Sequence, residues 1–273
     1  MADDLLAGYL RARRARLRPG DVGLPGGAGR RRVTGLRREE VALLAGISAD
    51  YYLRLEQGRG GTPSHQVLQA LARALRLDDA ATAYLTSLAA PAASEDTATP
   101  ATGEHVPPSV ENLVRLLPLP AFVTGRNFDV LTANRGASLI SPELSTGKNR
   151  LRSFFLVGSE KDLYRDWPAT AARFVAVVRD TVGRGAARPD FLELVAELSE
   201  RSAVFRQLWD RHDVVTRDTE LALLRHPVAG PLRLHLERLT IAGMPEQALV
   251  IYHPTAGSDD ARRLADLLGP AGS

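Results

Sequence analysis

The 273-residue chain contains no cysteine, only two lysines and no long apolar run. Without cysteine it can form neither disulfides nor thiolate metal sites, which fits a reducing compartment. No stretch approaches the roughly 20 apolar residues that span a bilayer. Residues 1–14 place acidic residues before the apolar positions and arginines after them, the reverse of a secretory signal peptide. We therefore expect a cytoplasmic protein that does not enter a membrane.

Sequence signatures of catalysis are also missing. His212, His226, His235 and His253 lack the i, i+4 pairing of a zinc-binding helix. The sequence has no Gly-X-Ser-X-Gly nucleophile elbow, no phosphate-binding glycine loop and no dinucleotide-binding fingerprint. We predict no catalytic residue, no metal and no cofactor, and therefore a protein that is not an enzyme.

Positive charge is concentrated near the N-terminus. Residues 1–90 hold 14 arginines and 9 acidic residues, a net charge of +5, whereas the remainder carries a net charge of −2. Arginine outnumbers lysine 33 to 2 throughout, so arginine usage alone indicates nothing about function. Its clustering at 11–18 and 29–32 is more informative, because closely spaced cations neutralise nucleic-acid phosphates. A solvated basic face is the alternative interpretation.

The length and the composition favour two domains. Residues 89–108 are rich in Ala, Pro, Ser, Thr and acidic residues and lack apolar periodicity, which is typical of a flexible linker. Upstream of this stretch the apolar spacing is helical throughout; downstream it is mixed. We predict a five-helix all-α domain at 1–88, a linker at 89–107, an α+β domain at 108–257, and a C-terminal helix and tail at 258–273.

The downstream half combines strand and helix patterns. Residues 121–134 predict two short strands joined at a Gly-X-Asn turn. Residues 231–241 alternate leucine with polar residues and predict a half-buried antiparallel strand, with 247–253 as its neighbour. Helical patterns occupy 166–182, 189–200 and 202–213. The expected architecture is an antiparallel sheet with helices to one side.

The most specific motif is GISADYYLRLEQGR at residues 46–59. Gly46 permits a tight turn after one helix, and Ser48 can cap the next helix by accepting a backbone N–H. Tyr52 and Leu55 would face the bundle, leaving the N-terminal outer residues of that helix exposed. This is the geometry of a helix-turn-helix, whose second helix reads base edges in the major groove. A helical bundle that never meets DNA is the alternative.

Individual residues of this motif have different expected roles. Arg54 would contact a base or a phosphate, and Tyr51 a thymine methyl group or a sugar. Asp50 would accept from a cytosine amino group, order a neighbouring arginine, or be a solvated acid at a helix start. Glu56 is expected to form a structural ion pair with an arginine of the first helix. The predicted DNA-binding residues are Arg30, Arg31, Arg32, Arg37, Arg38, Ser48, Ala49, Asp50, Tyr51, Arg54 and Arg59.

Residues 37–58 resemble the lambda-repressor-like XRE family, which shares the alanine before the turn, the Gly-aliphatic-Ser turn and the Glu-X-Gly ending. Residues 62–77 look like the fourth helix of that family. More narrowly, 9–25 and 30–46 resemble actinobacterial regulators that carry an MmyB-like C-terminal ligand-binding domain. The resemblance implies a transcription regulator that binds double-stranded DNA.

The segment from Pro108 to Pro254 resembles the MmyB-like ligand-binding domain, which has a PAS-like fold. The matching stretches are 117–134, 163–180, 194–214 and 225–239. Residues 216–227 lack the glycine usual before the His-Pro pair, and 137–149 depart locally. Because both departures could remodel a pocket, the ligand is not carried over from any relative.

The residues of this domain suit an apolar ligand. Its aromatic and aliphatic side chains would line a pocket for a fatty acyl chain or another largely apolar molecule, which the resemblance also implies. Three polar residues are candidates to orient a head group. The alternative is that the apolar side chains are plain core and the polar ones satisfy local backbone groups. The predicted ligand-binding residues are Phe122, Arg126, Phe128, Leu131, Asn134, Phe155, Trp167, Phe174, Trp209, His226, Leu234 and Tyr252.

The sequence therefore predicts a ligand-responsive transcription regulator that acts as a homodimer on a pseudo-palindromic operator. Two-fold symmetry would double the small DNA-contacting surface of one module. An alternative from another class is a DNA-tethered adaptor, whose second domain docks a partner protein without a ligand.

Overall fold

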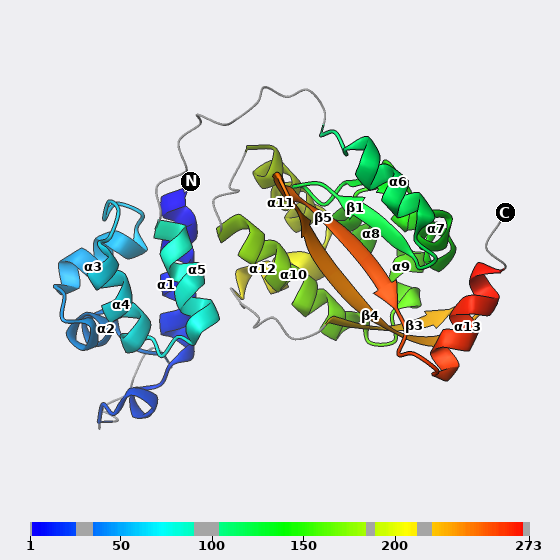
Figure 1. The fold of residues 1–273 in the computed structure, drawn as a ribbon. Helices are drawn as coiled ribbons and strands as arrows, with labels where there is room; N and C mark the ends of the chain where they lie inside the picture. Colours follow the sequence, from blue (N-terminus) through cyan, green and yellow to red (C-terminus); the bar gives the residue numbers. More distant parts are fainter. Residues whose placement is uncertain (1, 26–34, 90–103, 184–188, 212–219, 270–273) are drawn as a thin grey trace. The chain divides into compact units, whose positions relative to one another are not determined.

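The computed structural model describes residues 2–25, 35–89, 104–183, 189–211 and 220–269 (Figure 1). Residues 2–89, called the first unit below, and residues 104–269, called the second unit, are described separately; by their contacts, residues 173–183 and 207–211 group with the first unit. The predicted DNA contacts Arg30, Arg31 and Arg32, and most of the predicted linker, lie outside the described residues.

The first unit is a helical bundle, because apolar residues recur at three- and four-residue spacing along its helices. Its elements are α1 (Ala2–Arg16), η1 (Pro19–Val22), α2 (Arg38–Ala45), α3 (Ala49–Glu56), α4 (His65–Ala74) and α5 (Asp79–Ala89). Tyr9, Leu71 and Leu85 are buried at its centre. The Tyr9 hydroxyl on α1 donates a hydrogen bond to the Ala81 carbonyl on α5 (3.1 Å). The predicted five-helix bundle is confirmed.

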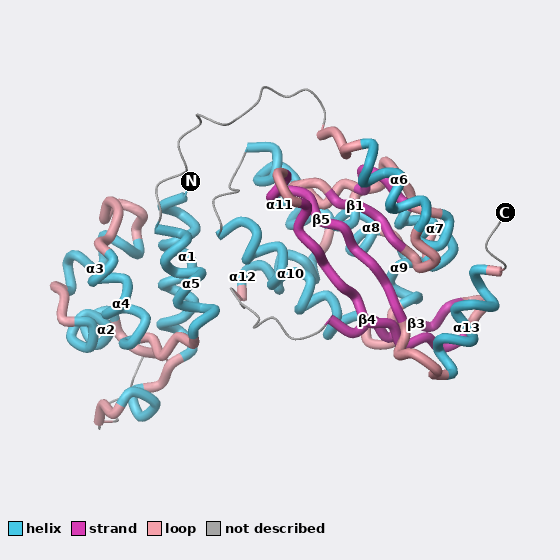
Figure 2. Tube along the Cα trace, in the orientation of Figure 1, coloured by secondary structure: helices cyan, strands magenta, loops and turns pink. Residues whose placement is uncertain are grey.

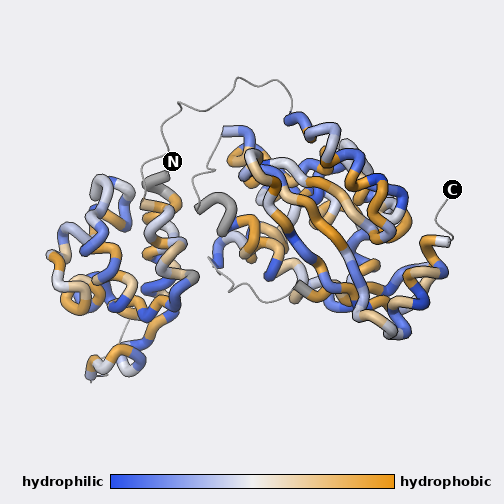
Figure 3. The backbone as a smooth tube through the Cα atoms, viewed as in Figure 1, coloured by the Kyte–Doolittle hydropathy of each residue, from blue (hydrophilic) through white to orange (hydrophobic). Residues whose placement is uncertain are grey.

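The second unit is built on a five-stranded antiparallel sheet (Figure 2). Its strands are β1 (Ala121–Thr124), β2 (Val130–Ala133), β3 (Glu220–His226), β4 (Gly230–Ile241) and β5 (Met244–His253). The spatial order is β2-β1-β5-β4-β3, so the last strand in the chain lies beside the first. The mainly apolar β1 and β5 occupy the interior of the sheet, and β4 is mixed (Figure 3). The predicted α+β fold with an antiparallel sheet is confirmed.

One strand, β3, was not predicted. Its sequence, ELALLRH, consists largely of good helix formers and lacks strict alternation. Pairing with β4 overrides this local preference: Ala222 lies opposite Leu234, and Leu224 lies opposite Leu232. All four side chains are buried, so tertiary packing determines the strand.

Helices cover both faces of the sheet, so the prediction of helices on one side is wrong. Val114 on α6 packs against Val123 and Leu249 on one face. Phe122 and Tyr252, which alternate with these strand residues, point to the opposite face and stack on each other. The helical elements of this half are α6 (Pro108–Leu116), α7 (Arg135–Ile140), η3 (Pro142–Leu144), α8 (Arg150–Leu156), α9 (Gly158–Leu163), α10 (Trp167–Gly183), α11 (Pro189–Arg201), α12 (Ala203–Asp210) and α13 (Asp259–Leu268).

The C-terminal helix α13 packs against β4. Its Leu264 side chain is buried, and the Arg263 guanidinium donates a hydrogen bond to the Pro231 carbonyl (3.2 Å). Within the described ranges, no helix is both long enough and apolar enough to cross a membrane.

Candidate DNA interface and ligand site

The turn between α2 and α3 has the geometry that the sequence predicts. Gly46 ends α2 with a left-handed backbone (φ 65°), and the Ile47 N–H donates to the Ala42 carbonyl (3.0 Å). The Ser48 hydroxyl then accepts the Tyr51 N–H (3.1 Å) and so caps α3. The three residues between the helices, Gly46, Ile47 and Ser48, therefore suffice to redirect the chain from one helix into the next.

The inner face of α3 is fixed by packing and by a buried ion pair. The Glu56 side chain, only 1% exposed, accepts hydrogen bonds from Arg14 Nε of α1 and Arg38 Nε of α2, each at 2.6 Å. Burial alone would raise the pKa of the Glu56 carboxyl, but the hydrogen bonds from Arg14 and Arg38 outweigh it and lower that pKa. The expected ion pair with an arginine of the first helix is confirmed. Arg38, predicted to contact DNA, is also a structural partner of Glu56.

The outer face of α3 presents the side chains predicted to meet DNA. Ser48, Ala49, Asp50 and Arg54 are exposed, and Tyr51 is half-buried. Arg54 Nη1 lies 3.4 Å from Asp50 Oδ2, and the Arg54 guanidinium carbon lies 5.9 Å from the centre of the Tyr51 ring. One helix face thus carries a carboxylate, an aromatic hydroxyl and a guanidinium close together. Asp50 orders a neighbouring arginine here, which is one of the roles proposed from the sequence.

Two further predicted DNA contacts lie at the ends of helices. Arg37 immediately precedes α2 and is exposed, and its backbone N–H is bound by the Glu40 carboxylate (2.7 Å). Arg59 follows α3, is exposed, and its N–H donates to the Arg54 carbonyl (2.9 Å). Both guanidinium groups are therefore at the surface of the first unit.

In the second unit, some of the predicted ligand-binding residues lie together. Phe155 makes an edge-to-face contact with Phe205 (5.0 Å between ring centres) and another with Trp167 (6.0 Å). Phe154 stacks on Trp167, whose indole N–H donates to the Phe154 carbonyl (3.3 Å). These rings form a continuous aromatic cluster from α8, α10 and α12.

A second group lies on the sheet. Phe122 on β1 stacks on Tyr252 of β5 (6.2 Å), and Leu234 of β4 is fully buried. Leu131 instead packs against the cluster under α6, on the opposite face. The structure therefore does not bring Leu131 together with Phe122.

Three other predicted residues are placed outside these groups. Phe128, in the β1–β2 loop, has a left-handed backbone (φ 64°) and lies 6.5 Å from Phe191. Phe174 is half-buried on α10. Trp209 on α12 lies beneath the Arg179 guanidinium, 4.2 Å from the ring centre.

The three polar candidates are engaged by the protein itself. The Asn134 side-chain oxygen accepts the N–H groups of Ala137 (2.9 Å) and Ala121 (3.1 Å), and its nitrogen donates to carbonyls that include Leu119 (2.8 Å). Asn134 thus caps α7 and joins it to β1. This arrangement matches the alternative in which the side chain satisfies local backbone groups.

His226 and Arg126 are held in different ways. His226 Nδ1 accepts the Ala229 N–H (3.0 Å), which closes the β3–β4 hairpin, and Nε2 lies 2.9 Å from the Leu139 carbonyl of α7. Arg126 lies within 4 Å of three carboxylates, those of Glu104, Asp190 and Glu246.

Sequence reasoning missed a buried polar network beside Tyr252. Arg150 Nη1 binds Glu160 Oε2 (3.0 Å), Arg150 Nη2 donates to the Tyr164 hydroxyl (3.3 Å), and the Ser141 hydroxyl donates to Glu160. Burial alone would lower the pKa of Arg150, but Tyr164 and Glu160 outweigh it and raise that pKa, so the guanidinium stays charged. Helical spacing was the signal in the sequence that could have found this network. Arg150 lies four residues before the buried Phe154, and residues four apart share one face of a helix.

A compact two-helix turn with an exposed second helix, in one chain with an α+β unit, defines a helix-turn-helix DNA-binding regulator. Family profiles agree: a helix-turn-helix domain matches residues 5–85, and the MmyB-like transcription regulator ligand binding domain matches residues 106–268. The chain belongs to the MmyB-like family of transcription regulators, and its two matched domains are regulatory rather than enzymatic. No individually curated protein matches the chain significantly.

Proposed function

We propose that the chain is a homodimeric cytoplasmic regulator that binds a pseudo-palindromic operator. Its affinity for that operator falls or rises when a largely apolar small molecule binds the second unit. The observation that supports this most strongly is the exposed face of α3, where Asp50, Tyr51 and Arg54 stand beside a rigid turn. In a helix-turn-helix, this is the part of the second helix that contacts base edges.

In this proposal the other cations position the protein on the duplex. Arg37 and Arg59 are exposed on either side of the turn and would bind phosphates, and the exposed part of Arg38 would add to them. One small module buries too little surface for strong specificity, so a second copy on a matching half-site supplies the remainder.

The proposed ligand lies among the apolar side chains on the face of the sheet that carries Phe122 and Tyr252. The aromatic cluster of Phe155 and Trp167 and the buried Leu234 support an apolar chemistry for this interior. A fatty acyl chain has that chemistry. Such a ligand regulates DNA binding only if its affinity for the DNA-bound dimer differs from its affinity for the free dimer.

The test begins with the full chain and a random pool of DNA duplexes. We expect the retained duplexes to share an inverted repeat, and we expect Tyr51→Ala to lower affinity for that repeat. Titration of the complex with saturated fatty acids of increasing length should then change the affinity. A pool without any enriched sequence would contradict specific binding, and affinity that no apolar compound changes would contradict regulation by such a ligand.

A second candidate function is a DNA-tethered adaptor, and one observation favours it. Leu113 and Leu116 on α6 are 46% and 71% exposed, which is unusual for large apolar side chains three residues apart on a helix. An adaptor would keep sequence-specific DNA binding while remaining insensitive to apolar compounds, so the same titration separates the two functions.

A further inference from the structure

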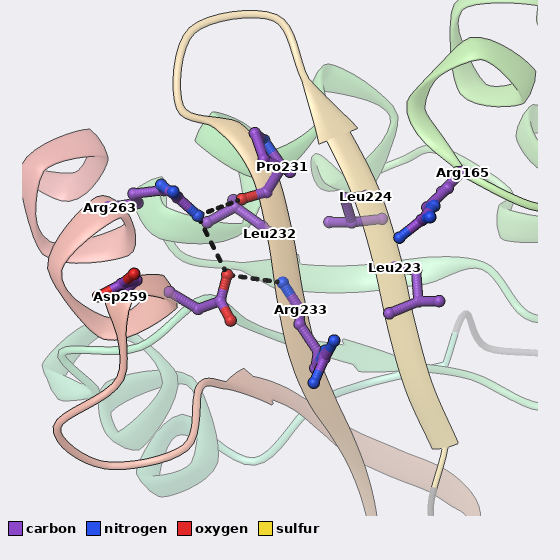
Figure 4. Close-up of a pocket in the computed structure, with 9 residues that line it drawn as sticks. Arg165, Leu223, Leu224, Pro231, Leu232, Arg233, Asp259 and Arg263 are labelled. Carbon is purple, nitrogen blue, oxygen red and sulfur yellow. Dashed lines mark hydrogen bonds and ion pairs between the residues drawn. The ribbon is translucent and has the colours of Figure 1, made fainter.

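A cleft of about 380 Å³ lies beside the β3–β4 hairpin, outside the interior discussed above (Figure 4). Its walls come from the segment after α9, from β3 and β4, and from the start of α13. None of the residues predicted to bind the regulatory ligand lines this cleft. The residues that define its chemistry are Arg165, Leu223, Arg233, Asp259, Asp260 and Arg263.

The two acids of the cleft are already neutralised by the protein. Asp260 Oδ1 accepts the Arg233 backbone N–H (3.2 Å) and lies 3.7 Å from Arg263 Nη1. Asp259 pairs with Arg262, one helical turn along α13. Arg262 and Arg263 are therefore already paired with these carboxylates.

Two cations remain. The guanidinium groups of Arg165 and Arg233 make no ion pair with any other described residue, and both side chains are exposed at the cleft. They reach it from separate segments: the Arg165 N–H binds the Leu223 carbonyl (2.8 Å) at the edge of β3, and Arg233 lies opposite Leu223 on β4. The backbone thus brings Arg165 and Arg233 to opposite sides of the same leucine.

The cleft also has an apolar part. Leu223 is half-buried and points to the same face of the sheet as Arg233, while Leu224 and Leu232 are buried beneath. Apolar surface with a few charged groups at one side is the usual composition of a small-molecule site.

We propose that this cleft binds a small organic anion, whose carboxylate or phosphate is held by Arg165 and Arg233 and whose apolar part lies on Leu223. Guanidinium groups form strong charge-assisted hydrogen bonds with both anions. The volume accommodates a compact molecule rather than a long acyl chain, so this site goes beyond the regulatory ligand proposed above.

The experiment is calorimetric titration of the full chain with three probes. Phenyl phosphate carries both features, inorganic phosphate only the anion, and benzyl alcohol only the apolar ring. We expect phenyl phosphate to bind most tightly and benzyl alcohol not to bind. Arg165→Gln and Arg233→Gln should each weaken phenyl phosphate about tenfold or more, because each removes a charge-assisted contact.

The matched control is Arg225→Gln, which changes an exposed arginine of β3 that does not line the cleft. It should leave the affinity unchanged, and far-UV circular dichroism should show that all variants are folded. The proposal is overturned if phenyl phosphate fails to bind at millimolar concentration, if inorganic phosphate binds equally well, or if Arg233→Gln binds like the unaltered chain. Each of these results leaves the DNA-binding and fatty-acid experiments unaffected, so the two proposals fail separately.

Discussion

Arg54 is the residue on which the proposed sequence-specific DNA binding depends most. Its guanidinium is kept near the outer face of α3 by Asp50 and by the ring of Tyr51, so part of the entropy of ordering it is lost before DNA binds. We expect Arg54→Ala to weaken binding to the selected operator by about 1–3 kcal/mol. Fluorescence anisotropy on operator and scrambled duplexes, at several salt concentrations, measures the effect.

The pattern of that loss identifies the contact. A base contact predicts relaxed specificity at one position, whereas a phosphate contact predicts equal weakening on all duplexes and a flatter salt dependence. Arg73→Ala, at an exposed arginine of α4, is the control. Unchanged operator binding by both Arg54→Ala and Tyr51→Ala would show that α3 is not the recognition helix.

The buried Glu56 carboxylate should make the stability of the first unit sensitive to acid. Its pKa is below the ordinary value of 4.5 in the folded chain, so its stabilisation is present above the unfolded-state pKa and is lost as the pH falls through the lower folded-state pKa. We expect the free energy of opening α1 to α3 to fall as the pH drops below about 4.5. Hydrogen exchange of the backbone amides in these helices measures it.

Glu56→Gln tests the cause. At neutral pH it should cost about 3 kcal/mol, because it leaves the mostly buried Arg14 without its carboxylate, and it should make the acid dependence shallower. Glu39→Gln changes an exposed acid of α2 and should alter neither quantity. Identical acid profiles for Glu56→Gln and the unaltered chain would refute this role.

Among the elements, the α2–α3 turn depends on one backbone conformation. Gly46 has φ 65°, and a Cβ at this position would meet no atom within 4 Å, so substitution is costly only through the left-handed backbone. We expect Gly46→Ala to destabilise the first unit by about 1 kcal/mol. Gly20→Ala, at a glycine with equal space and no positive φ, should be nearly neutral. Equal stability of the two variants in thermal unfolding would contradict this explanation.

Asn134 connects α6, β1 and α7, and its substitution distinguishes a cap from a ligand contact. Asn134→Ala removes the cap of α7 and leaves buried backbone groups unpaired, so we expect a loss of about 2–4 kcal/mol in the stability of the second unit. Tryptophan fluorescence during denaturation reports it, with the exposed Asn112→Ala as control. Unchanged stability together with lost fatty-acid binding would instead assign Asn134 to the ligand.

How far the elements could be predicted depended on their periodicity. The helices around Gly46 and the alternating strand β4 were predicted because each carries a local pattern that its burial reinforces. The strand β3 and the helix α6 were not predicted. The residues of β3 favour a helix, and only their pairing with β4 makes them a strand, while α6 is stabilised by its packing on the sheet.

The residues of the candidate sites also differ in whether the local sequence could predict them. Local chemistry predicted the Ser48 cap and the Glu56 ion pair, which involve fixed spacing or an obligatory partner for a buried charge. The Arg150–Glu160 pair and the cleft at Arg165 and Arg233 join segments distant in sequence, and no single stretch marks them. The choice among ligand-lining residues therefore depends on tertiary structure.

For the whole molecule, the family and the two units establish a DNA-binding transcription regulator with a ligand-binding domain. The central proposal adds two-fold symmetry and a bound apolar molecule. Symmetry and ligand are coupled in that proposal, because a ligand that favours one separation of the two recognition helices changes the affinity for a fixed half-site spacing.

Native mass spectrometry of the full chain mixed with its selected operator duplex tests this proposal most directly. The proposal predicts two chains per duplex and, in either the free or the DNA-bound chain, an additional small mass per chain that disappears under denaturing conditions. One chain per duplex, with the bare mass of the chain in every state, would contradict both the dimer and the ligand.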